Sequence, residues 1–152
     1  MQKSADGVQV RYTYGVPTVP GAKAELTYTV EPQGTLLVEA VYHGVPGAPE
    51  LPCFGVKFQF TLEQHNACGQ TAAALTIEQA DAPFAFSALP NTAQEIEAAQ
   101  HITELPATGR TSVTILGAAR GVGGIDSWGT DVEEPYRVSG EGEHRVAFRI
   151  VL

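Results

Sequence analysis

Apolar and polar positions alternate along much of this chain, and the period of two predicts a fold built from β-strands. The first alternating stretch covers residues 8–14, and its apolar positions are Val8, Val10, Tyr12 and Tyr14. Residues 26–30 and 35–42 repeat the alternation on either side of a Pro-Gln-Gly turn, which predicts a hairpin of two long strands. The three prolines and two glycines of residues 43–52 predict a loop after this hairpin.

The alternation continues through the second part of the chain. Four bulky side chains on one face predict the best core strand of the protein, and they are Phe54, Val56, Phe58 and Phe60. Further strands are predicted at residues 71–77, 83–88, 111–116, 136–138 and 144–151. A count of about eight or nine strands separated by turn signals is typical of an all-β, antiparallel β-sandwich.

One helix is predicted, at residues 91–99. Asn91 or Thr92 is its expected N-cap, and Glu95 stands at the capping-box position. Its sequence holds a single large apolar residue, Ile96, so we expect this short helix to lie on the surface.

Length and charge narrow the class of protein. A chain of 152 residues fits one domain, with residues 1–6 expected as a disordered lead-in and residues 7–152 as the sandwich domain. The formal net charge of −8 argues against nucleic acid and against an anionic membrane surface as partners. The two cysteines are too few for a disulfide framework, and no signal sequence or long apolar run is found, so a cytoplasmic location is expected.

The stretch Gly-Val-Gly-Gly-Ile-Asp-Ser-Trp-Gly at residues 121–129 carries the only tryptophan, Trp128. Its glycines predict an irregular loop that leaves a strand. The indole can pack inward as a plug, which is favoured because tryptophan is buried on average, or present a flat apolar face to a sugar ring. Covering about 100 Å² of indole gains roughly 2.5 kcal/mol, whereas association costs about 4 kcal/mol or more. The ring alone therefore supplies only part of a sugar subsite.

Other chemistry is weakly represented in the sequence. The four histidines have no metal-site spacing, and no cofactor is expected. His65 and Cys68 resemble a base and a nucleophile but lack a third group to orient them. The glycines of residues 117–124 lack the lysine and the following helix of a phosphate loop. The carboxylates of residues 131–134 are typical of a solvated loop, so no catalytic residue is predicted.

Two groups of motifs resemble the C-terminal small-chain domain of glycoside hydrolase family 2 β-galactosidases. The first group is Tyr-Thr-Tyr-Gly-Val-Pro-Thr-Val-Pro-Gly-Ala at residues 12–22, Tyr-His-Gly at 42–44 and Glu-Leu-Pro-Cys-Phe-Gly-Val-Lys-Phe at 50–58. The second is Phe-Ser-Ala-Leu at 86–89, Glu-Ala-Ala-Gln-His-Ile-Thr-Glu-Leu-Pro at 97–106, the tryptophan loop at 121–129, and the segments at 136–138 and 148–150. The resemblance covers nearly all of residues 7–152, in the same order.

The resemblance implies an antiparallel sandwich of the galactose mutarotase-like, supersandwich type that packs beside a catalytic barrel. In that family the catalytic glutamates belong to the barrel, so this chain is expected to be non-catalytic. Trp128 and Asp126 are the substrate-binding residues that the resemblance implies, Trp128 by stacking on the sugar and Asp126 more by shaping the loop. Family members carry a long insertion that residues 61–67 replace here, which implies a shortened sandwich.

The leading hypothesis is therefore an accessory domain of a β-galactosidase that acts on lactose-like β-galactosides, with the barrel and other domains of the parent enzyme as partners. A stand-alone carbohydrate-binding module that holds small sugars weakly is the first alternative. A structural or subunit-contact domain, including a homo-oligomer, is the second.

Overall fold

The computed structural model describes residues 2–4, 7–61, 75–123, 126 and 128–151. Within these residues the chain forms nine strands and three short helices, two of them 3₁₀ helices. The strands are β1 (Gln2–Ser4), β2 (Gly7–Gly15), β3 (Lys23–Val30), β4 (Leu36–His43), β5 (Cys53–Phe60), β6 (Thr76–Gln79), β7 (Ala85–Leu89), β8 (Thr111–Ala119) and β9 (Glu143–Val151). The helices are α1 (Ala93–Ala98), η1 (Ile102–Glu104) and η2 (Glu134–Tyr136).

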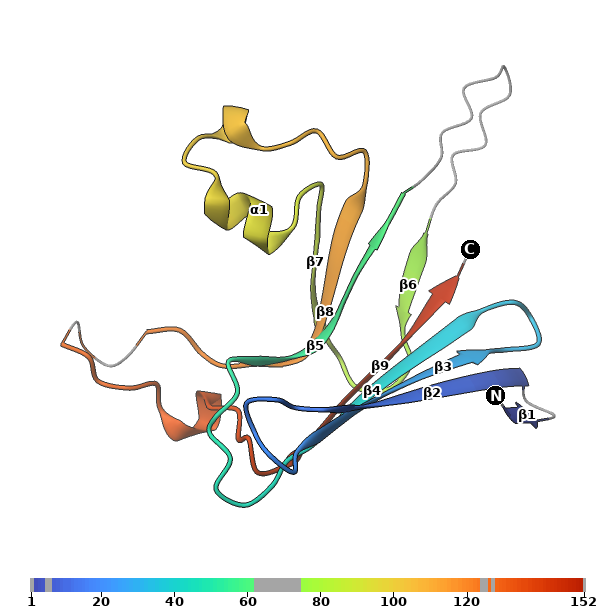
Figure 1. The fold of residues 1–152 in the computed structure, drawn as a ribbon, viewed down its shortest axis with the longest axis horizontal. Helices are drawn as coiled ribbons and strands as arrows, with labels where there is room; N and C mark the ends of the chain where they lie inside the picture. The colour runs from blue at the N-terminus through green and yellow to red at the C-terminus, as the bar shows by residue number, and fades with distance from the viewer. Residues whose placement is uncertain (1, 5–6, 62–74, 124–125, 127, 152) are drawn as a thin grey trace.

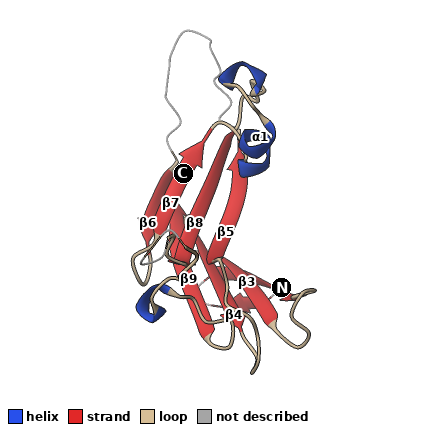
Figure 2. Ribbon diagram, turned by 90° about the vertical axis from the view of Figure 1, so that its left-hand side faces the viewer, coloured by secondary structure: helices blue, strands red, loops and turns tan. Residues whose placement is uncertain are grey.

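The strands form two antiparallel sheets of unequal size (Figures 1 and 2). The larger sheet has the order β1-β2-β3-β4-β9-β6, and the smaller has the order β5-β8-β7. This arrangement confirms the predicted all-β sandwich, and the β3–β4 pairing confirms the predicted hairpin. Within the stretch expected as a lead-in, Gln2–Ser4 form β1 and pair with β2.

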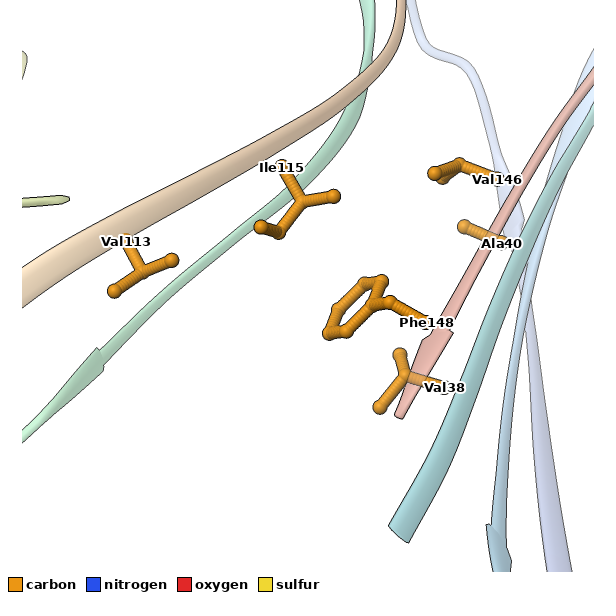
Figure 3. Close-up of a cluster of buried hydrophobic side chains, with 6 residues drawn as sticks. All are labelled: Val38, Ala40, Val113, Ile115, Val146 and Phe148. Atoms are coloured by element: carbon orange, nitrogen blue, oxygen red, sulfur yellow. The ribbon is translucent and has the colours of Figure 1, made fainter. Parts of the chain in front are cut away.

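The core lies where β8 faces β4 and β9 (Figure 3). Its buried members are Val38, Ala40, Val113, Ile115, Val146 and Phe148. Phe148 and Ile115 are completely buried, and each such side chain contributes about 1.5–3 kcal/mol by leaving water. The Phe148 ring stacks on Phe58 with a centroid distance of 6.1 Å and meets the edge of Phe84 at 6.2 Å.

The apolar face of β5 is less buried than its pattern predicts. Its four bulky residues pack against the core but remain half-buried, so the expectation that this is the best core strand is wrong. β5 is an edge strand of the smaller sheet, and only β8 pairs with it in the described residues. The buried residues of the main core instead lie on β4, β8 and β9, which are interior to their sheets.

A second expectation fails near the C-terminus. Residues 136–138 do not form a strand, because Pro135 stands in the first turn of η2, which runs through Tyr136. Proline fixes φ near the helical value and removes a backbone donor, and both effects favour a turn over a strand. The chain then extends through Arg137 without joining a sheet.

Helix α1 begins as predicted. The Thr92 hydroxyl accepts from the Glu95 amide at 3.1 Å, and a Glu95 carboxylate oxygen accepts from the Thr92 amide at 2.7 Å, which completes a capping box. None of its residues is buried, so the expected surface position is confirmed. The helices of the described residues have three to six residues, and none of them could cross a bilayer.

Candidate functional site

The candidate site is the loop between β8 and η2, which extends away from both sheets at the left of Figure 1. The Gly121 amide donates to the Tyr136 carbonyl at 2.8 Å, so the two ends of the loop are joined at its base. Gly123 and Gly129 have φ values of +86° and +96°, a region that side chains with a Cβ rarely adopt. These two glycines therefore permit the bends that carry the loop off the sheet.

Trp128 is held out in solvent by this loop. Its exposed fraction is 93%, so the expectation of an inward plug is wrong. Val122 on the same loop is fully exposed as well. Among the described residues, the indole is covered by neither sheet, because the loop leaves β8 in a direction away from both of them (Figure 1). Of the two alternatives raised from the sequence, the structure favours the outward aromatic face.

Asp126 fixes the backbone around Trp128. Its Oδ1 accepts from the Trp128 amide at 2.8 Å, and its Oδ2 accepts from the Thr130 hydroxyl at 2.8 Å. The bond from the Trp128 amide, followed by the bond from Thr130, lowers the pKa of Asp126 below its ordinary value. Asp126 therefore orients Trp128 through the backbone. Ser127, which stands between Asp126 and Trp128 in the sequence, lies outside the described residues.

A four-membered ion-pair network anchors the base of the loop. Arg120 contacts Glu50 at 3.1 Å and also contacts Asp131, while Arg137 contacts the same two carboxylates at 3.4 and 3.3 Å. The Val132 amide and then Arg120 lower the pKa of Asp131. Single exposed pairs stabilise little, but two forked guanidiniums that share two carboxylates restrict the geometry of the group. The network ties the loop to the segment between β4 and β5.

The network borders a pocket of about 530 Å³, whose lining includes Glu50, Glu134, Arg137 and Glu141. The pKa values of Asp126 and Asp131 are both lowered from the ordinary value. A general acid for glycoside cleavage needs the opposite, a carboxyl whose pKa is raised. In the described part of the chain, no three metal-ligating side chains converge.

Two of the four histidines, His43 and His144, have side-chain contacts with neighbouring groups. His43 lies 3.1 Å from Glu143 and 3.9 Å from Glu25, and a ring nitrogen of His144 lies 2.6 Å from the Ser139 carbonyl oxygen. His65 and Cys68 lie outside the described residues.

Three residues of the network, Glu50, Arg120 and Arg137, were not predicted as site residues from the sequence. Glu50 is 70 positions from Arg120 and 87 from Arg137, and no local pattern could have brought them together.

The fold and the loop define a class of protein, an all-β sandwich that presents an aromatic side chain on an anchored loop. The sequence model of the family described as beta galactosidase small chain matches residues 60–152. The chain is 33% identical to the beta-galactosidase small subunit of Latilactobacillus sakei over 208 aligned positions, which cover 98% of this chain and 65% of that subunit. It is 26% identical to the beta-galactosidase of Streptococcus thermophilus over 201 positions, which cover 99% of this chain and 20% of that protein.

This chain therefore belongs to the β-galactosidase small-chain family. It spans about two thirds of the length of the L. sakei subunit and a fifth of the S. thermophilus enzyme. Both alignments are longer than the 152 residues of the chain, so both relatives contain residues with no counterpart here. The shortening expected at residues 61–67 falls almost entirely on residues outside the described ranges.

Proposed function

We propose that this chain is the non-catalytic, C-terminal small-chain component of a glycoside hydrolase family 2 β-galactosidase, and that Trp128 completes a sugar subsite in the assembled enzyme. The catalytic glutamates would be supplied by a barrel that packs beside this sandwich. Membership of the small-chain family and the small fraction of the S. thermophilus enzyme that the chain covers support this proposal.

The observation that carries the proposal is the outward indole of Trp128 on an anchored loop. The exposed indole of Trp128 is a large apolar surface, and a ligand that covers it removes that surface from water, which is favourable. The turn made by Asp126 and the network around Arg120 fix the loop before any ligand arrives. A fixed ring loses less entropy on binding than a mobile one, which suits a stacking platform.

The carboxylates nearby support an accessory role over a catalytic one. Asp126 and Asp131 have lowered pKa values, and Glu50 is shared between two guanidiniums. A carboxyl whose pKa is lowered, as for these two aspartates, is poorly suited to protonate a leaving oxygen. We infer that the proton transfer and the nucleophile belong to the partner, and that this chain contributes binding.

The test compares lactose hydrolysis by the assembled enzyme with wild-type chain, Trp128→Ala and Trp128→Phe. Losing about 2.5 kcal/mol of stacking would raise KM for lactose by up to about 70-fold. Trp128→Phe should restore part of the loss. Val122→Ala, a fully exposed position on the same loop, is the matched control and should leave KM unchanged. Equal KM values for Trp128→Ala and Val122→Ala would refute the subsite.

A stand-alone carbohydrate-binding module also explains an exposed Trp128, and titration of the isolated chain separates the two functions. Saturation of the tryptophan fluorescence by galactose, glucose or lactose without any partner would favour the module. The structural-domain alternative expects a buried Trp128, and the 93% exposure does not meet that expectation.

A further inference from the structure

The two faces of the larger sheet differ in chemistry. In β2 and β3, Tyr12 is opposite Leu26, Val10 is opposite Tyr28 and Tyr14 is opposite Ala24, so these side chains share one face. The register continues from Leu26 to Ala40 of β4, a member of the core. The tyrosines therefore lie on the inner face of the sandwich, the side that a second sheet normally covers.

The smaller sheet covers only part of that inner face. β8 contacts β9 and β5 contacts β4, so β3 and β2, which follow β4 in the larger sheet, extend beyond the edge of the smaller sheet. Tyr12 and Tyr14 are consequently 48% and 51% exposed, although they occupy inner positions. Their rings lie 6.4 Å apart and nearly parallel, and Tyr12 meets Tyr28 edge to face at 6.2 Å.

No charged residue occurs on this uncovered face of β2 and β3, whereas the opposite face carries ion pairs. Arg11 lies 3.6 Å from Glu25, and Arg145 lies 2.7 Å from Glu39 of the adjacent strand. The charged face is therefore the one adapted to water. An uncharged surface rich in tyrosine has the composition of a protein interface core. Partial burial of Tyr28, together with its neighbours Tyr14 and Tyr12, raises the pKa of the Tyr28 hydroxyl.

The smaller sheet has an open strand edge on the same side of the sandwich as the tyrosines. Among the described strands β5 pairs only with β8, so within these residues its other edge has no strand partner for its backbone donors and acceptors. Because β5 lies on β4, this edge is the one directed toward β3 and β2. The half-buried Phe54, Val56 and Phe58 of β5 continue the apolar surface up to it.

We propose that an extended segment of the catalytic chain adds to the open edge of β5 and lays its apolar side chains on Tyr12, Tyr14 and Tyr28. This inference rests on the proposed function, which supplies the partner. One added strand would pair with the free backbone groups of β5. Neighbouring strands are about 4.8 Å apart, so the uncovered width of β3 and β2 leaves room for about two added strands. A second copy of this chain fits less well, because each copy carries a net charge of −8.

Hydrogen exchange and affinity together test the proposal. The chain is measured alone and mixed with the β-galactosidase catalytic chain of the same source. In an edge strand about every second backbone amide points away from the paired strand. These amides of β5, which point away from β8, should exchange more slowly with solvent in the complex than in the free chain. Tyr12→Lys and Tyr14→Lys should weaken the complex at least about tenfold, because a charge would be buried in an apolar contact. Thr13→Lys, between them on the opposite face, is the control and should bind like wild type, with circular dichroism verifying the fold of each variant.

The outcomes separate the two proposals. A wild-type chain that forms no complex with the catalytic chain contradicts the proposed function and the partner named here. A complex that forms with unchanged β5 exchange, and with Tyr12→Lys as tight as Thr13→Lys, contradicts the strand addition alone. Self-association of the free chain with protection of β5 would assign the surface to a second copy and overturn the proposal.

Discussion

Truncation of Phe148 tests whether the two sheets are held together as described. Phe148 is completely buried on β9, and its ring contacts Phe58 of the smaller sheet and Phe84. Phe148→Ala removes this burial and both ring contacts, and should lower the free energy of unfolding by about 3–5 kcal/mol. Phe148→Leu keeps most of the apolar volume and should cost less than about 1.5 kcal/mol.

The assay is urea unfolding followed by far-ultraviolet circular dichroism. Tryptophan fluorescence is a poor probe here, because Trp128 is already exposed in the folded chain. Phe86→Ala is the matched control, since Phe86 is 71% exposed and its truncation should change stability by no more than about 0.5 kcal/mol. Similar losses for Phe148→Ala and Phe86→Ala, or a loss below about 1 kcal/mol for Phe148→Ala, would refute the assigned core.

Three further predictions concern the loops. Gly140→Ala should lower the free energy of unfolding by more than about 2 kcal/mol in the same urea assay, because the added Cβ would lie 1.8 Å from the Pro49 carbonyl oxygen. Gly142→Ala is the control and should be tolerated, because a Cβ added there meets nothing within 4 Å. Trp128 should be quenched by acrylamide as efficiently in the folded chain as in urea, and strong protection when folded would contradict the exposed loop. Because the pKa of Asp131 is lowered in the folded chain, its contacts contribute stability above the ordinary pKa of 3.8, and this contribution is lost as pH falls through the folded-state pKa. Asp131→Asn should therefore make the thermal unfolding temperature less sensitive to pH below about pH 4. An unchanged dependence of that temperature on acid pH would count against the network.

The sequence predicts the strands well where alternation is long. The β3–β4 hairpin and the capping box at Thr92 follow from local pattern alone, because the turn, the strands and the cap are each determined within a few residues. The motifs also indicate the family, which the comparison with the L. sakei small subunit then shows.

Burial could not be predicted from the same pattern. Alternation shows that the aromatics of β5 share a face, but their half-buried state depends on β5 being an edge strand. The exposure of Trp128 likewise depends on the direction in which two glycines turn the loop, which residue averages do not determine. The contacts of Glu50 with Arg120 and Arg137 join residues that are far apart in the sequence, so no local pattern predicts them.

The most direct measurement of the central claim follows Trp128 with and without the catalytic chain. Because Trp128 is the only tryptophan, incorporation of 5-fluorotryptophan into this chain gives one ¹⁹F resonance for the candidate site. We predict that lactose leaves this resonance unmoved in the isolated chain and shifts it to saturation once the unlabelled catalytic chain is bound. A saturating shift in the isolated chain, or an unmoved resonance in the assembled enzyme, would contradict the account.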